Sequence, residues 1–175
     1  QARDYGLGDD ILAQDLGNRR VRLLRGKLKG TPGNIFVFGP SHRLVCGIAV
    51  TDCRDVTIED VTLYHCGGMG VIGQRSRDLF VRRVKVTPPP GKNRIVSLTA
   101  DATHFVNCGG QVVLEDCLFE LQKDDATNVH GIYVRIVERL SPTVVDVKLV
   151  HPQQYGFDFI QKGQKLELVK GPALI

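Results

Sequence analysis

Two short strings of the sequence share one pattern, and each begins with a carboxylate. Asp101 opens Asp-Ala-Thr-His-Phe and Asp125 opens Asp-Ala-Thr-Asn-Val, and Asp124 directly precedes Asp125. The offset between the two strings is 125 − 101 = 24 residues. If this offset is one turn of a repeat, Asp101 and Asp125 stack about 5 Å apart on neighbouring strands. We therefore expect three carboxylates to meet at one site.

Glycoside hydrolysis is the chemistry that such a cluster suggests. Stacked ionised carboxylates repel one another unless a ligand, a proton or a metal compensates. A separation of about 5 Å would suit a retaining pair. Alternatively, Asp101 and Asp125 hold one water and act jointly as base, while Asp124 lies farther off and donates the proton. That second arrangement predicts inversion, because inverting enzymes separate acid and base by about 6.5–9.5 Å. The structural alternative is that the aspartates form Asx-turns.

Four further residues are candidates for substrate binding. They are polar or aromatic residues that follow the carboxylates or end a nearby loop: Asn128, His130, Tyr133 and Arg94. Each also has a structural interpretation, as a stacked Asn in a turn, a His beside a turn glycine, a Tyr in the core and a solvated Arg. His130 would either bond a sugar hydroxyl or tune the acid.

The elements that position these residues form an internal repeat. Asp55–Leu63, Asp78–Val86 and Gln111–Phe119 all read x-apolar-x-apolar-polar-polar-apolar-x-apolar. The first offset is 78 − 55 = 23 residues, and the second, 111 − 78 = 33, includes the Pro- and Gly-rich stretch Thr87–Arg94. Short β-branched runs at such a period are typical of stacked β-coils. The sequence therefore predicts an all-β protein containing a right-handed parallel β-helix, a solenoid like that of pectate lyases.

Three regions are expected along the chain. Residues 1–41 form an N-terminal β segment or early coil, and residues 42–140 form the coils that carry the active site. From residue 141 to residue 175 longer alternating runs predict the start of an antiparallel, barrel-like module. Pro142 favours a boundary there, because proline cannot donate to a strand ladder.

Composition excludes several classes of protein. The 175 residues have a net charge of +4 and are 24% charged, which argues against disorder, and no apolar run is long enough for a membrane span. The basic stretch Asn18–Lys29 alternates with apolar residues, so we interpret it as a strand and expect no nucleic-acid partner. The five cysteines lack CxxC spacing, so we expect no zinc site, and no metal or cofactor elsewhere. Cys117 falls in an inward column with Val61 and Val84.

The strings ADATHF and DDATNVHG, within residues 95–135, resemble glycoside hydrolase family 110. This resemblance implies an exo-acting, inverting α-1,3-galactosidase that releases terminal galactose from blood-group-B-type or linear glycans. It also implies that Asp124 is the proton donor and that Asp101 and Asp125 activate the water. The likeness extends over residues 47–169, and family members are several times longer. The Gln1 start and the abrupt end suggest a segment of a longer protein. We expect the full-length protein to form a homo-oligomer.

Other functions fit the same scaffold. A polysaccharide lyase would bind Ca²⁺ at the aspartates and use Arg94 or Arg135 to abstract a proton. A polygalacturonase-like hydrolase has a similar layout, although the Asn-x-Asp motif is replaced here by Thr99-Ala100-Asp101. A non-catalytic β-helical glycan-binding module would need no acid triad. By analogy with exported bacterial glycan-degrading β-helix enzymes, we expect a secreted or periplasmic location.

Overall fold

The computed structural model describes residues 12–24, 31–35, 37, 43 and 45–169. The chain forms two compact units, Gln1–His42 and Arg43–Ile175. In the first unit, β1 (Ala13–Asp15) pairs antiparallel with β2 (Val21–Leu23). β2 lies in the basic stretch that the sequence predicts to be a strand, and residues 25–29 of that stretch lie outside the described residues.

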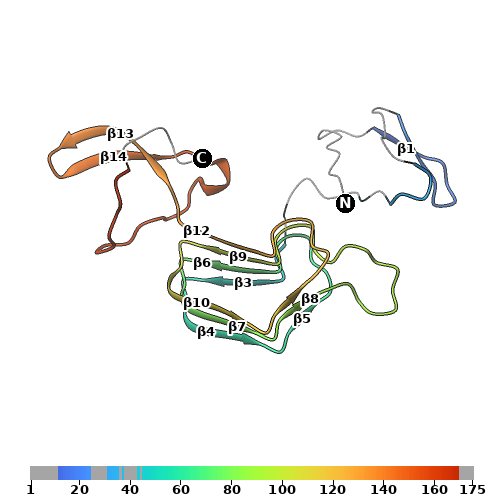
Figure 1. Ribbon diagram of the computed structural model, residues 1–175. Coiled ribbons are helices and arrows are strands. Elements are labelled where there is room, and N and C mark those ends of the chain that lie inside the picture. The colour runs from blue at the N-terminus through green and yellow to red at the C-terminus, as the bar shows by residue number, and fades with distance from the viewer. Residues whose placement is uncertain (1–11, 25–30, 36, 38–42, 44, 170–175) are drawn as a thin grey trace. The chain divides into compact units, whose positions relative to one another are not determined.

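Three parallel sheets form most of the second unit, and successive strands of the chain alternate among them (Figure 1). The first sheet has the order β12-β9-β6-β3, the second β10-β7-β4 and the third β11-β8-β5. The strands are β3 (Ile48–Thr51), β4 (Arg54–Glu59), β5 (Thr62–Leu63), β6 (Val71–Gln74), β7 (Arg77–Arg82), β8 (Lys85–Val86), β9 (Thr103–Val106), β10 (Gly109–Glu115), β11 (Leu118–Phe119) and β12 (Thr127–His130).

The register of these strands confirms the repeat alignment made from the sequence. Leu79 of β7 lies between Val56 of β4 and Val112 of β10, at the second position of each repeat. The Pro- and Gly-rich stretch Thr87–Arg94 lies between β8 and β9, so the extra residues of the 33-residue offset are looped out. The prediction of an all-β chain with parallel sheets is therefore confirmed.

An antiparallel hairpin follows the parallel sheets. It consists of β13 (Val134–Ser141) and β14 (Val144–Leu149), and a short 3₁₀ helix, η1 (Pro152–Gln154), comes after it. The antiparallel pairing thus begins at Val134, before the predicted boundary at residue 141, and Pro142 lies in the hairpin turn. Among the described residues, no helix is long and apolar enough to cross a membrane.

The apolar core lies between the sheets and consists of inward-facing side chains. Phe105 of β9 is 1% exposed and packs in one cluster with Leu79 of β7 and with Val84, which lies between β7 and β8. Cys117 and Val61 pack against the same cluster, as the predicted inward column requires. A Cβ on Gly73 would lie 2.8 Å from the Phe105 ring, so the glycine leaves room for this large side chain.

Each set of three successive strands, such as β3–β5, forms one layer, and where the chain passes from one sheet to the next it bends at residues in the left-handed backbone region. Such residues are usually Gly, Asn or Asp, because other side chains are strained there. Two corners recur in register along the stack: Asp52 (φ 53°), Arg75 (φ 47°) and Asn107 (φ 54°) at one, and Asp60 (φ 56°), Arg83 (φ 48°) and Asp116 (φ 52°) at the other. The sheets are therefore joined by tight, repeated bends.

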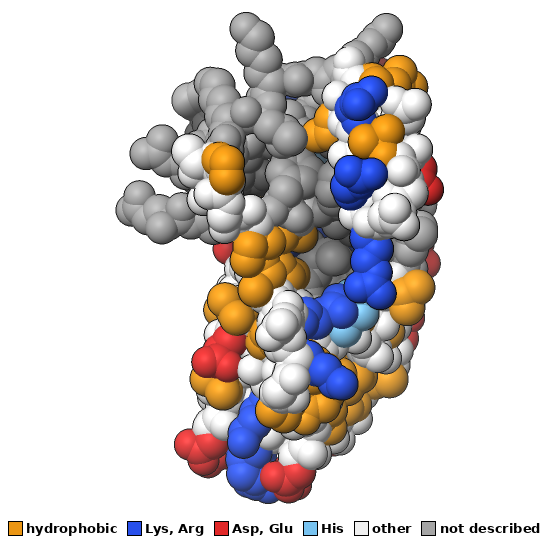
Figure 2. Space-filling view, turned by 90° about the vertical axis from the view of Figure 1, so that its right-hand side faces the viewer, with side chains coloured by type: hydrophobic (Ala, Val, Ile, Leu, Met, Phe, Trp, Pro, Cys, Tyr) orange, Lys and Arg blue, Asp and Glu red, His pale blue; other side chains and the backbone are white. Residues whose placement is uncertain are grey.

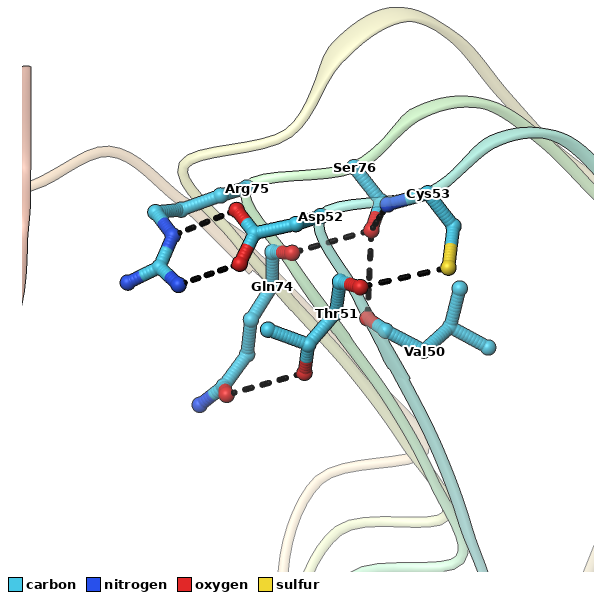
Figure 3. A network of polar contacts seen from close by, with 7 residues as sticks. All are labelled: Val50, Thr51, Asp52, Cys53, Gln74, Arg75 and Ser76. Atoms are coloured by element: carbon cyan, nitrogen blue, oxygen red, sulfur yellow. Dashed lines mark hydrogen bonds and ion pairs between the residues drawn. The ribbon is translucent and has the colours of Figure 1, made fainter. Parts of the chain in front are cut away.

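Ion pairs between neighbouring layers stabilise these corners. Arg75 donates from Nε to Asp52 Oδ1 at 2.7 Å and from Nη2 to Asp52 Oδ2 at 2.5 Å (Figure 3). In the same network, the Ser76 hydroxyl accepts a hydrogen bond from the Cys53 backbone N–H at 3.1 Å. Arg83 makes the equivalent bidentate contact to Asp60 at 2.8 and 2.9 Å. Figure 2 likewise shows acidic side chains beside basic ones at the lower end of one face.

These pairs predict a loss of stability in acid. Hydrogen bonds from Arg75 and Arg83 hold the pKa values of Asp52 and Asp60 below their ordinary value of 3.8. A carboxylate with a lowered folded-state pKa stabilises the protein above its unfolded-state pKa, and this contribution disappears as the pH falls through the folded-state value. We expect the urea midpoint to fall as the pH decreases below about 4. The double variant Asp52→Asn/Asp60→Asn should show a shallower pH dependence, and an unchanged slope would contradict the prediction.

Candidate active site

The three predicted carboxylates converge at the first sheet. Asp101 lies just before β9 and is 2% exposed, whereas Asp124 and Asp125 are exposed and lie before β12. One carboxylate oxygen of each lies within 4.8 Å of the others. The predicted convergence is confirmed, but Asp124 lies nearer than the separation expected for an inverting acid. All three side chains therefore belong to one site.

Backbone and side-chain contacts between β9 and β12 hold the two aspartate strings together. Thr103 pairs in register with Thr127, and the Thr103 hydroxyl lies 2.9 Å from the Thr127 hydroxyl. The Ala102 N–H donates to the Asp125 carbonyl at 2.9 Å. The Ala and Thr of the repeated string therefore set the register that brings Asp101 next to Asp125.

A hydrogen-bonded chain of two histidines extends from Asp101. His104 Nδ1 lies 2.6 Å from Asp101 Oδ2, and His104 Nε2 lies 3.0 Å from His130 Nε2. His130 Nδ1 contacts the Gly131 carbonyl oxygen at 2.7 Å. Both ring nitrogens of His130 are thus engaged within the protein, which disfavours the predicted bond to a sugar hydroxyl. The sequence analysis did not identify His104, although it occupies the position equivalent to Asn128 in the repeated string.

Asp124 and Asp125 also have polar partners. Arg43 Nη2 lies 2.5 Å from Asp124 Oδ2 in a half-exposed ion pair. Asn128 donates from Nδ2 to Asp125 Oδ2 at 3.3 Å, so this predicted binding residue does lie beside the carboxylates. No local signal in the sequence connects Arg43 with Asp124, because 81 residues separate them. Only the folded chain brings this cation to the site.

Two of the predicted binding residues make no described contact with the carboxylates. Arg94 donates from Nε to the Val96 carbonyl at 2.9 Å, and its Nη2 lies 2.6 Å from His65 Nδ1. Tyr133 is 65% exposed and therefore does not pack in the core. Arg94 lies in the loop between β8 and β9, and its side chain contacts His65 and not the carboxylates.

Two buried oxygen atoms near the carboxylates lack a protein partner among the described residues. They are Thr99 Oγ1 and Gln122 Oε1. Each precedes one of the aspartates by two residues, Thr99 before Asp101 and Gln122 before Asp124. Buried polar atoms are normally hydrogen-bonded to protein or water. Both atoms are buried, so they are not exposed to a ligand.

The arrangement supports acid–base chemistry. The carboxylate oxygens could hold a hard cation such as Ca²⁺. The Arg43 guanidinium already pairs with Asp124, however, and His104 pairs with Asp101, so the protein itself supplies cationic or donor partners to two of the three groups. Clustered carboxylates in different environments are the catalytic equipment of glycoside hydrolases.

Comparison with known proteins agrees with this class. The chain is 41% identical over 148 residues to α-1,3-galactosidase A of Shewanella woodyi, a match covering 83% of the chain and 24% of the relative. It is 31% identical to α-1,3-galactosidase A of Akkermansia muciniphila (91% of the chain, 27% of the relative) and 34% identical to α-1,3-galactosidase B of that organism (92% and 20%). Residues 144–175 match the family model of the GLAA-B beta-barrel domain II.

These relatives confirm the resemblance to the α-1,3-galactosidases of glycoside hydrolase family 110. The chain spans about a quarter of the length of these relatives. The similarity extends over 83% or more of the chain in each of these three relatives.

Proposed function

We propose that the protein carrying this chain is an exo-acting, inverting glycoside hydrolase that releases terminal α-1,3-linked galactose from glycans. The observation that carries the assignment as a glycoside hydrolase is the convergence of Asp101, Asp124 and Asp125, with carboxylate oxygens within 4.8 Å of one another. The inverting mechanism rests on the resemblance to glycoside hydrolase family 110. The similarity to proteins named α-1,3-galactosidase supports the substrate class. Blood-group-B-type and linear α-1,3-galactosyl structures are both candidate substrates.

We further propose that the parallel sheets are coils of a right-handed β-helix, with β3–β5, β6–β8 and β9–β11 as successive coils. Supporting this, equivalent strands pair in parallel and in register across all three sheets. β12 begins the next layer and carries Asn128 and His130. In such a stack the carboxylates lie where one layer ends and the next strand begins, and Asp124 and Asp125 are exposed to a glycan there.

In the proposed reaction, Asp101 and Asp125 hold a water molecule that attacks the anomeric carbon. The bond between that carbon and the glycosidic oxygen breaks, and the leaving oxygen takes a proton from Asp124. The attacking water gives its proton to the Asp101–Asp125 pair, so atoms and charges balance. Asp124 is paired with Arg43 in the structure, and substrate must draw the guanidinium away before this carboxyl can carry a proton. Asn128 holds Asp125 in place for the reaction.

The stereochemistry of the first-formed sugar tests this proposal. The complete gene product is mixed with an α-1,3-linked galactosyl disaccharide and followed by proton NMR. We expect β-galactose first, because the water attacks the face opposite the leaving group. The test is needed because the carboxylate oxygens lie within 4.8 Å of one another, and retaining enzymes hold their carboxyl groups about 5–5.5 Å apart. Initial α-galactose would show retention and overturn the inverting mechanism.

The same preparation separates the hydrolase from a lyase. Galactose release should persist in the presence of a chelator, because no step in the proposed reaction uses a metal. A chelator-sensitive rise in ultraviolet absorbance on a uronate-containing polysaccharide, with no galactose release, would instead establish a lyase.

A further inference from the structure

The hydrogen-bonded chain Asp101–His104–His130 contains one proton more than its neutral histidines can supply. Three contacts link it together, from Asp101 to His104, from His104 to His130 and from His130 to the Gly131 carbonyl. Each contact needs one proton between its two heavy atoms. A carboxylate and two neutral imidazoles have only two nitrogen-bound protons. If all three contacts are hydrogen bonds, this series of groups holds a third proton and has no net charge.

The position of the extra proton follows from chemistry and distance. The Gly131 carbonyl only accepts, so His130 must donate from Nδ1. Imidazole is a stronger base than a carboxylate, which places the third proton on a histidine. His104 is the histidine in direct contact with Asp101, at 2.6 Å, and an imidazolium is most favourable next to the anion. His104 is then the cation, Asp101 stays ionised and His130 is neutral.

Burial makes this pairing effective. The side chain of Asp101 is 3% exposed and that of His104 is 12% exposed, so solvent screens their attraction little. The His104 and His130 rings meet edge to face, with centroids 4.9 Å apart. On β6, the residue paired with His104 is the neutral Ile72. The sheet thus provides no competing charge beside His104.

The other charged groups of the site determine its net charge. Arg43 offsets Asp124, and an imidazolium at His104 offsets Asp101. The described hydrogen-bond partner of the Asp125 carboxylate is the neutral Asn128 amide. The cluster of three carboxylates then has a net charge of −1, which resolves the repulsion expected from stacking Asp101 on Asp125.

We propose that His104 is a positioning residue that, as an imidazolium held by His130, keeps Asp101 ionised and oriented beside Asp125. This inference rests on the proposed function, because it explains how two neighbouring carboxylates can both hold the attacking water. His130 acts through His104 by accepting a hydrogen bond from the His104 Nε2–H group. Neither histidine touches the reacting atoms.

The first test observes the proton without using activity. The complete gene product is labelled with ¹⁵N-histidine, and the His104 signal is assigned with His104→Asn. At neutral pH we expect both His104 ring nitrogens to be protonated in the wild type and one to lose its proton in Asp101→Asn. The matched control is His151→Asn, because His151 is exposed and does not take part in the Asp101–His104–His130 series of contacts. A neutral His104 in the wild type would overturn the proposal.

The second test compares kcat and KM on the α-1,3-galactosyl disaccharide. His104→Asn keeps an N–H donor toward Asp101 but cannot be an imidazolium, so kcat should fall about 10²-fold, with KM changed less than about threefold. His151→Asn should match the wild type. A wild-type kcat in His104→Asn would reject the positioning role while leaving the hydrolase intact. If the wild type releases no galactose, the proposed function fails, and the NMR result still decides the charge of His104.

Discussion

Replacing Asp125 with Asn is expected to lower kcat on α-1,3-galactosides by about 10²–10⁴-fold, the range typical of acid–base groups, with little change in stability. Asp125 is exposed, and its described polar partner is the neutral amide of Asn128. The Asn variant keeps the shape of the side chain but cannot accept the proton of the attacking water. Initial rates of galactose release and thermal unfolding, measured on the complete gene product, check both parts of the prediction.

The controls for Asp125→Asn come from the same chain. Asp146→Asn changes an exposed carboxylate of β14 in the same way and should keep wild-type turnover. Asp101→Asn should lose activity too, but it should also destabilise the fold by about 1–3 kcal/mol, because it removes the charge from a buried partner of His104. If Asp125→Asn retains full activity, Asp125 is not part of the base.

Phe105→Ala is expected to cost about 3–5 kcal/mol of unfolding free energy, as is usual when a buried aromatic side chain is removed. Phe105 is 1% exposed and contacts the core cluster between the sheets. The same cluster holds neighbouring layers together. The cavity would lie on the inner side of β9, the strand that carries both Phe105 and His104. Urea unfolding followed by far-ultraviolet circular dichroism measures the loss.

Phe80→Ala provides the matched control. Phe80 is on β7, next in sequence to the inward-facing Leu79, and its ring lies 5.5 Å from the Arg82 guanidinium carbon. Because successive residues of a strand face opposite sides, Phe80 faces away from the core. We expect its removal to cost less than about 1.5 kcal/mol, through the lost contact with Arg82. Equal losses in the two variants would contradict the assignment of the inner and outer faces.

The repeat was predictable because it is written in local patterns. Side chains alternate along a strand, so an apolar-x-apolar run identifies its inward face without knowledge of the partner strand. A constant offset then specifies which residues lie next to one another, as with Val56, Leu79 and Val112. The same reasoning predicted the convergence of Asp101 and Asp125, which the register of Thr103 with Thr127 produces.

Pro142 shows where local patterns are insufficient. The sequence favours a boundary between two regions at this proline, and the structure places it in the turn of a hairpin that begins at Val134. A proline is compatible with either position, because it is excluded only from places where a backbone N–H must donate. The choice between them depends on whether β13 pairs with a neighbouring layer or with β14.

By itself, the sequence determined the class of fold, the register of the repeats and the three carboxylates that meet at the site. Only the tertiary structure decided the partners of those carboxylates: Arg43 reaches Asp124 from 81 residues away, and His104 bonds to Asp101 and then to His130. The physical reason is that stacking follows a period that can be read along the chain. Ion pairing depends on side-chain direction and on loops whose paths have no period, and these determine which partner each carboxylate has.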